Sequence, residues 1–111
     1  MNPEVKKYLD DMLYSILLIE NHIENISSLS DYENDQKTID SVERRLAIIG
    51  EALFKVEKIE NTIGITDRRK IIGLRHILVH DYDLIEDSTI WLIITKSLPV
   101  LKSELLRLID E

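Results

Sequence analysis

Apolar residues recur at intervals of three and four along almost the whole chain, which is the spacing of one face of an α-helix. The first such stripe consists of Val5, Leu9, Met12, Ile16, Ile19, Ile23 and Ile26. Pro3 suits the first turn of a helix, where its missing N–H has no partner in any case, and Asn2 is a suitable N-cap. We therefore expect a first helix that starts near Pro3 and reaches Ile26, followed by a polar turn over residues 27–35.

Two more helices are predicted in the middle of the chain. The second runs from about residue 36 to residue 61, with the stripe Val42, Leu46, Ile49, Leu53 and Val56. Thr66 and Asp67 have the character of an N-cap for a third helix. That helix should end near His80–Asp83, because the segment HDYDLIED has no helical apolar period. Its stripe consists of Ile71, Leu74 and Leu78.

The last predicted helix contains a proline. Asp87 or Ser88 can cap this helix, and Pro99 removes one backbone hydrogen bond inside it and should bend it. Its stripe consists of Ile94, Leu98, Leu101, Leu105 and Leu108. Four helices joined by short polar links predict an all-α protein, an antiparallel four-helix bundle that forms a single domain over residues 1–111.

The second and third helices are apolar on more than one face. The apolar positions outside the main stripes are Ile48, Ala52, Ile72 and Val79. They indicate either a wide stripe that faces the core or the interface of a two-fold homodimer, because a small bundle cannot cover two apolar faces of each helix. Gly50 costs roughly 1 kcal/mol in mid-helix relative to alanine, and it either permits close approach of another helix or has no effect on packing.

Composition and charge exclude several classes of protein. The 111 residues carry a net charge of −7 and include no cysteine, so there is no disulfide, no thiolate metal site and no cysteine nucleophile. No apolar run approaches the ~20 residues of a membrane helix, and the first residues lack an apolar signal core. We therefore expect a cytoplasmic protein. The negative charge disfavours nucleic-acid binding by the whole surface, so any such contact requires a local basic segment.

One segment, RRKIIGLRHILVHDYD at residues 68–83, concentrates basic residues in this acidic chain. The basic residues are Arg68, Arg69, Lys70, Arg75, His76 and His80. Such a cluster can attract a phosphate group while the rest of the surface repels polyanions. Alternatively, the first three cations are simply solvated, although cations are unfavourable beside the positive end of the helix dipole.

Two histidines in this segment raise the possibility of a metal site. His76 and His80 are four residues apart and can share one face of a helix, as zinc ligands do. Asp81 or Asp83 would have to supply a third ligand. The glutamate of the H-E-x-x-H arrangement is absent, so we predict no metal site.

Arg75 and His80 are the second candidate pair. They are five residues apart, which is about 140° around a continuous helix. They can converge if the helix unwinds at His80, or if two copies of the pair meet across a dimer axis. An arginine and a histidine that converge on a phosphodiester suffice for a metal-free ribonuclease, because the histidine transfers protons and the arginine stabilises the phosphate charge.

The stretch Arg75–Tyr82, RHILVHDY, resembles the R-x4-H-x-Y motif of the HepT-type toxins of the HEPN superfamily. The resemblance covers nearly the whole chain. Arg44 and the following LAIIGEA are similar to the R-x-L-E-I-I-G-E-A signature of that family. Trp91 and the SLPVL around Pro99 also fall in the order and spacing of the family.

Two residues depart from the family pattern. Ala47 replaces the usual glutamate, which removes a salt bridge from the second helix. His76 stands where asparagine is commonest, and it keeps a polar side chain at this position. The residues of the motif itself are intact.

The resemblance implies an all-helical homodimer that acts as a metal-independent endoribonuclease without a cofactor, at a cleft between its two motifs. Arg75 and His80 would be the catalytic pair. The implied partner is MntA, a nucleotidyltransferase antitoxin of the type VII class, which transfers AMP from ATP to the motif tyrosine, here Tyr82. The alternatives are a non-catalytic module that binds nucleotides or partners a nucleotidyltransferase, and a Tyr82 that is merely a buried structural residue.

Overall fold

The computed structural model describes residues 1–110, and every regular element in that range is helical. The predicted all-α class is confirmed. In chain order the elements are α1 (Pro3–His22), α2 (Leu29–Glu33), α3 (Gln36–Ile59), α4 (Arg68–His80), the 3₁₀ turn η1 (Tyr82–Leu84), α5 (Asp87–Leu92), the π-helical turn η2 (Ile93–Ser97) and α6 (Leu98–Asp110). None of the helices in this part of the chain is both long enough and apolar enough to cross a membrane.

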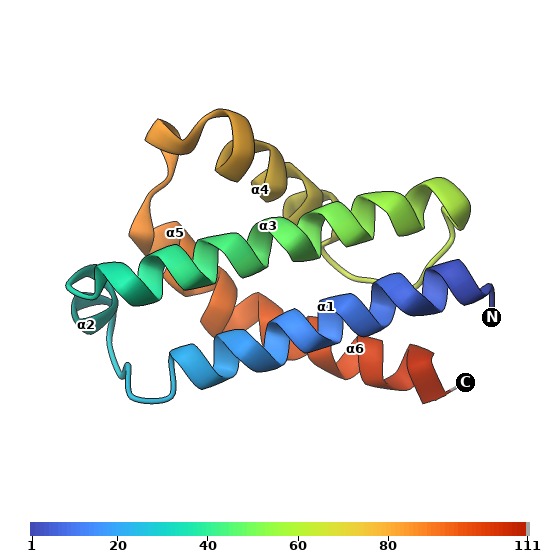
Figure 1. Ribbon diagram of the computed structural model, residues 1–111, viewed down its shortest axis with the longest axis horizontal. Coiled ribbons are helices and arrows are strands. Elements are labelled where there is room, and N and C mark those ends of the chain that lie inside the picture. Colours follow the sequence, from blue (N-terminus) through green and yellow to red (C-terminus); the bar gives the residue numbers. More distant parts are fainter. Residues whose placement is uncertain (111) are drawn as a thin grey trace.

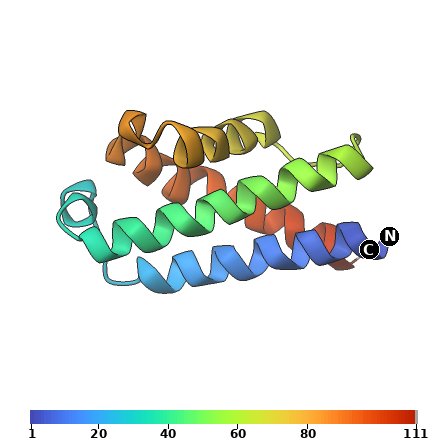
Figure 2. The ribbon, with the colours of Figure 1, turned by 45° about the horizontal axis from the view of Figure 1, so that its top comes forward.

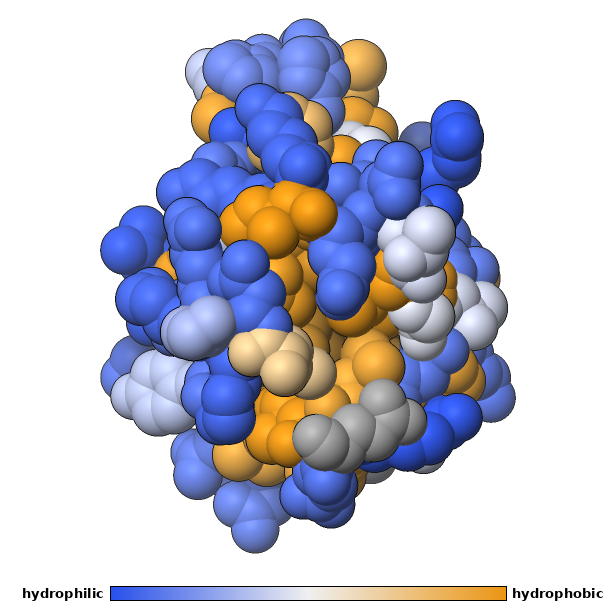
Figure 3. Space-filling view, turned by 90° about the vertical axis from the view of Figure 1, so that its right-hand side faces the viewer, coloured by the Kyte–Doolittle hydropathy of each residue, from blue (hydrophilic) through white to orange (hydrophobic). Residues whose placement is uncertain are grey.

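The long helices form the predicted antiparallel bundle. Figures 1 and 2 show α1 and α3 side by side in opposite directions, with α6 packed against α1. Helix α4 packs against α3 and runs back along it. Both ends of the chain lie at the same end of the bundle. Viewed from that end, a mostly hydrophilic surface surrounds an apolar centre (Figure 3).

The hydrophobic core is built from the predicted stripes. Val5, Leu9, Met12, Ile16 and Ile19 of α1 are all buried, as are the stripe residues of α3. Helix α1 starts as predicted, because the Asn2 side chain accepts hydrogen bonds from the backbone N–H groups of Glu4 and Val5 at 2.7 and 3.2 Å. It ends at His22, before the predicted Ile26. Ile26 still packs against the core, so the apolar stripe continues beyond the last residue of the helix.

The segment predicted as a polar turn contains the short helix α2. Ser28 caps it by accepting a hydrogen bond from the Asp31 N–H at 3.1 Å. The helix places Tyr32 in the core, where its ring centroid lies 5.6 Å from that of Trp91. Burial of Tyr32 and the Ser28 cap therefore both stabilise a helical turn in an otherwise mostly polar stretch.

The starts of α4 and α5 differ from the predicted caps. Asp67 precedes α4 in the left-handed conformation, with φ 60°, and its side chain makes no cap hydrogen bond. The Thr66 hydroxyl donates instead to Glu104 of α6 at 2.9 Å, so it is not available to α4. Asp87 is the first residue of α5 rather than its cap, and Glu86 before it makes no side-chain cap bond.

The irregularity predicted at Pro99 takes the form of the π-helical turn η2 directly before it. The Leu98 N–H donates to the carbonyl of Ile93, five residues earlier. The Thr95 hydroxyl donates to the carbonyl of Trp91 at 2.7 Å. A proline ring clashes with the carbonyl four residues before it, so a wider turn at this place accommodates Pro99.

Candidate functional site

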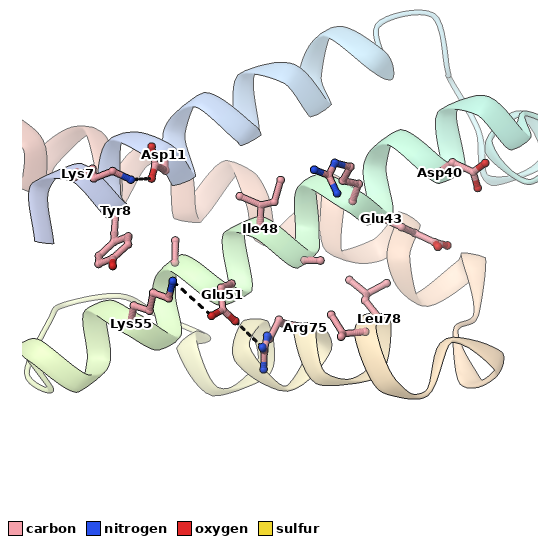
Figure 4. Close-up of a pocket in the computed structure, with 14 residues that line it drawn as sticks. Lys7, Tyr8, Asp11, Asp40, Glu43, Ile48, Glu51, Lys55, Arg75 and Leu78 are labelled. Carbon is pink, nitrogen blue, oxygen red and sulfur yellow. Dashed lines mark hydrogen bonds and ion pairs between the residues drawn. The ribbon is translucent and has the colours of Figure 1, made fainter. Parts of the chain in front are cut away.

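A groove of about 590 Å³ opens between α1, α3 and α4, and one residue of the predicted catalytic pair lies in it (Figure 4). Arg75 contributes to the α4 wall. Three of the four apolar positions outside the main stripes also line the groove, namely Ile48, Ala52 and Val79. Ile72 is partly buried against the core instead. Charged residues of α1 and α3 complete the lining, so the groove has both apolar and ionic walls.

Arg75 is held by residues of α3. Its Nη2 atom lies 2.6 Å from Oε2 of Glu51, and its guanidinium carbon lies 5.9 Å from the centre of the Phe54 ring. The latter distance is at the outer limit of a cation–π contact. Only 28% of the Arg75 side chain is exposed. The arginine is therefore held in place while part of its side chain remains accessible and lines the groove.

Gly50 permits this close approach of α4 to α3. A Cβ atom at position 50 would collide with Cβ of Arg75 and would lie 3.0 Å from the carbonyl oxygen of Ile71. The interpretation of Gly50 as a site of close helix contact is confirmed. The residue that it accommodates is the arginine of the motif.

His80 lies at the other end of the motif and faces a different environment. It is the last residue of α4 and is exposed, and its ring centroid lies 4.9 Å from that of His76. Nε2 of His76 lies 3.8 Å from a carboxylate oxygen of Asp81. Within residues 1–110, no set of three or more histidine, aspartate or glutamate side chains is arranged to hold a metal ion.

Arg75 and His80 are not brought together within one chain. Over residues 1–110 no hydrogen bond or ion pair joins them, and Arg75 is directed toward α3. The unwinding that would have redirected His80 starts one residue too late, at Asp81, because His80 is still helical. Unwinding of α4 at His80, one of the two arrangements left open by the sequence, is therefore not observed.

Tyr82 lies in η1, two residues after the end of α4, and 75% of it is exposed. The alternative of a buried structural tyrosine is therefore wrong. Its neighbour Leu84 is 66% exposed. The end of α4 thus presents a histidine, a phenol and an apolar side chain to solvent.

The three cations at the start of α4 lie far from this end. Arg68 is occupied by structural contacts, since its Nε lies 3.5 Å from Oε2 of Glu57 and its Nη1 donates to the Asn61 carbonyl at 2.6 Å. Arg69 and Lys70 are exposed and form no ion pair within residues 1–110. They lie ~15 Å or more from His80 along the helix axis. The structure therefore separates these cations from the C-terminal end of the motif.

Two glutamates of α3 in this groove were given no role by the sequence. Glu51 pairs with Arg75, and only the tertiary packing of α4 on α3 reveals this. Glu43 lines the same groove, where burial first and then repulsion from Asp87 and Asp40 raise the pKa of its carboxyl. Gly50 indicated close helix contact, and Glu51 lies within the LAIIGEA stretch that resembles the family signature, but neither observation identified Arg75 as the partner.

Comparison with known proteins identifies relatives along the whole chain. A protein from Methanocaldococcus jannaschii named "Gamma-glutamylcyclotransferase and putative RNase MJ0434" is 30% identical over 112 residues, which cover 100% of this chain and 50% of that protein. The chain thus spans half the length of this relative. "Putative RNase MJ0125" and "Putative RNase MJ1216" of the same organism are 29% and 28% identical. These matches cover 96% of this chain, and 95% and 91% of the two proteins.

No solved structure matches the chain significantly. The profile of one protein family, described as "Ribonuclease HepT-like", matches residues 12–108. This range contains the groove residues of α3 and α4 together with the whole R-x4-H-x-Y segment. The chain belongs to the HepT-like ribonuclease family.

Proposed function

We propose that this chain is a metal-independent endoribonuclease and the toxin of a type VII toxin–antitoxin pair, with Arg75 and His80 as its catalytic residues. The observation that carries the proposal is the intact motif inside the family match. The anchored, partly accessible Arg75 and the exposed His80 support it. Both residues are available to an RNA strand without any unfolding of the bundle.

The chemistry needs only these two side chains and the RNA itself. The 2′-hydroxyl oxygen attacks the adjacent phosphorus while a histidine removes its proton. The bond from phosphorus to the 5′-oxygen breaks, and a histidine protonates the departing oxygen. The guanidinium of Arg75 hydrogen-bonds to the phosphate oxygens and stabilises the charge that builds on them. The products are a 2′,3′-cyclic phosphate and a free 5′-hydroxyl.

Two chains would build this site together. Arg75 pairs with Glu51 of α3, whereas His80 is exposed at the end of α4, so the arginine of one chain would act with the histidine of the other in a two-fold homodimer. The apolar side chains near His80 support such an interface, since Val79 is 50% exposed and Leu84 is 66% exposed. Sedimentation equilibrium is expected to give a dimer of the 13.0 kDa chain at micromolar concentration. A monomer would refute the composite site.

The first test of the activity is RNA cleavage by single variants. Arg75→Ala and His80→Ala are each expected to lower the cleavage rate by at least ~100-fold, because positioned proton transfer and charge stabilisation are each worth that much. Circular dichroism should show the wild-type helical signal for both variants, since both side chains lie outside the core. EDTA should leave the wild-type rate unchanged. Inhibition by EDTA that zinc reverses would favour a metal site at His76 and His80.

A mixing experiment tests whether the site is shared. The Arg75→Ala and His80→Ala proteins are mixed and incubated until their subunits have exchanged, and the cleavage rate is then measured. A composite site predicts recovery of about a quarter of the wild-type rate, because half of the dimers carry one intact site out of two. A mixture as inactive as its components would place both residues of each site on one chain. Cleavage by neither variant nor wild type, with the fold intact, would favour the non-catalytic interaction module.

We further propose that a nucleotidyltransferase antitoxin of the MntA type silences the toxin at Tyr82. The phenol oxygen attacks the α-phosphorus of ATP, the new P–O bond forms, pyrophosphate leaves, and the phenol proton is released. The exposure of Tyr82 in η1 supports this role. The added phosphate would compete with RNA for Arg75.

Intact mass measured after incubation with the neighbouring antitoxin, ATP and magnesium tests the modification. The wild type should gain AMP units and lose RNA cleavage. Tyr82→Phe should remain unmodified and active. A Tyr82→Phe protein that is modified and silenced like the wild type would exclude Tyr82 as the switch.

A further inference from the structure

The carboxylate of Glu51 lies between two cations (Figure 4). Its Oε2 is 2.6 Å from Nη2 of Arg75 on α4, and its Oε1 is 3.8 Å from Nζ of Lys55 on its own helix. Oε2 is buried and has no hydrogen-bond partner of good geometry. The charge of Arg75 is therefore what compensates this buried oxygen. The contact with Lys55 is longer and lies at the surface, where ion pairs contribute little.

The same arginine is restrained on two other sides. Its Cβ lies directly over Gly50, and Phe54 lies under its guanidinium. A guanidinium has five N–H donors in a rigid planar fork, so fixing one amino group also fixes the directions of the others. The contact with Glu51 thus uses one corner of the fork and determines where the remaining donors point.

We infer that Glu51 is a positioning residue for Arg75, a role that rests on the ribonuclease function proposed above. Glu51 holds the guanidinium so that its other donors meet the scissile phosphate in the geometry of the transition state. Loss of the carboxylate frees the arginine to move, which weakens stabilisation of the transition state more than binding of the substrate. It also removes a negative charge from a site that attracts phosphate, so binding of RNA should not weaken.

Glu51→Gln tests this role because it keeps the size of the side chain and removes only the charge. The expected result is a kcat about ten- to a hundredfold lower with KM unchanged or lower, since a small displacement of a catalytic group costs up to ~100-fold in rate. Glu51→Asp keeps the charge on a shorter arm and should recover part of the loss in kcat. A higher KM at unchanged kcat would overturn the inference.

Glu57→Gln is the matched control. Glu57 also joins α3 to α4 through an ion pair, with Arg68 at 3.5 Å, but it lies away from Arg75. If Glu51 merely tethered the two helices, both variants would lower kcat alike. The positioning role predicts wild-type kcat for Glu57→Gln. An equal loss in the two variants would refute the inference.

A measurement independent of cleavage separates this inference from the proposed function. The Nε–H signal of Arg75, identified by its absence from Arg75→Lys, reports the order of the guanidinium by nuclear magnetic resonance. We expect an ordered Nε–H group in the wild type and in Glu57→Gln, and increased mobility in Glu51→Gln. Unchanged order in Glu51→Gln would refute the positioning role even if RNA is cleaved. Loss of order in a protein whose Arg75→Ala variant still cleaves RNA would refute the ribonuclease assignment of Arg75 instead.

Discussion

The two mid-helix glycines give a sharp test of the packing between α3 and α4. Replacing a helical glycine by alanine stabilises a helix by roughly 1 kcal/mol when space is available. Gly73 in α4 has no atom within 4 Å of the new methyl group, so Gly73→Ala should gain that amount. At Gly50 the methyl group meets Cβ of Arg75 and the Ile71 carbonyl, neither of which is the end of a flexible side chain.

Accommodating the methyl group at Gly50 requires α4 to move outward. Overpacking of this kind costs about 1–3 kcal/mol, which offsets or exceeds the gain in helix propensity. Gly50→Ala should therefore be about 1–3 kcal/mol less stable than Gly73→Ala. In thermal unfolding this difference corresponds to a Tm lower by at least ~4 °C for a chain of this size.

Thermal unfolding followed by far-ultraviolet circular dichroism provides the assay. Wild type and both variants are measured at one protein concentration, because dimerisation would make the Tm concentration-dependent. A Gly50→Ala protein as stable as Gly73→Ala would refute the argument that Gly50 is required by close contact. The same variant should also cleave RNA more slowly, since displacement of α4 moves Arg75.

Three further substitutions test individual features of the fold. Asn2→Ala should lower the free energy of unfolding by ~1 kcal/mol in urea denaturation through loss of the α1 cap, whereas an unchanged midpoint would mean that the first turn is frayed. Tyr32→Phe should stabilise by ~1 kcal/mol, because the Tyr32 hydroxyl is buried without a partner; a destabilised variant would reveal a partner. Burial raises the pKa of Glu43, so the native state holds this proton more tightly than the unfolded state and loses stability as pH rises through the raised pKa. Glu43→Gln should therefore be more stable than wild type at pH 7, and the gain should vanish below the ordinary carboxyl pKa of ~4.3 in urea titrations across pH.

The positions of the long helices could be predicted because their stripes are regular. Residues such as Leu9 and Leu53 repeat at helical spacing, and burial of these side chains fixes both the helix and its orientation. Helix α2 could not be predicted in this way. Its five residues are mostly polar, and it is held in place by packing of Tyr32 on Trp91, which lies 59 positions later in the chain. The prediction that Thr66 helps to cap α4 was wrong for the same reason, a contact with a residue distant in the sequence. The Thr66 hydroxyl donates to Glu104 of α6.

In the candidate site, too, the residues close together in the sequence could be predicted, whereas contacts between distant residues could not. Arg75, His80 and Tyr82 lie within eight consecutive residues, so spacing and resemblance sufficed to select them. The pairing of Arg75 with Glu51 depends on which faces of α3 and α4 meet, and no local pattern specifies that. The spacing left open whether the helix unwinds at His80, and in the structure α4 stays helical through this residue.

The π-helical turn η2 has a consequence for the register of the C-terminal helical segment. In a regular α-helix, Leu98 would point ~80° away from Ile90, eight residues before it. The wide turn takes up one extra residue, equivalent to ~100° of rotation, so Ile90, Ile94 and Leu98 all remain in the core. The turn thus acts as a one-residue insertion retained within a helix. It keeps the apolar face of α6 aligned with that of α5. The number of residues in the turn over residues 93–97 therefore sets which face of α6 meets α1.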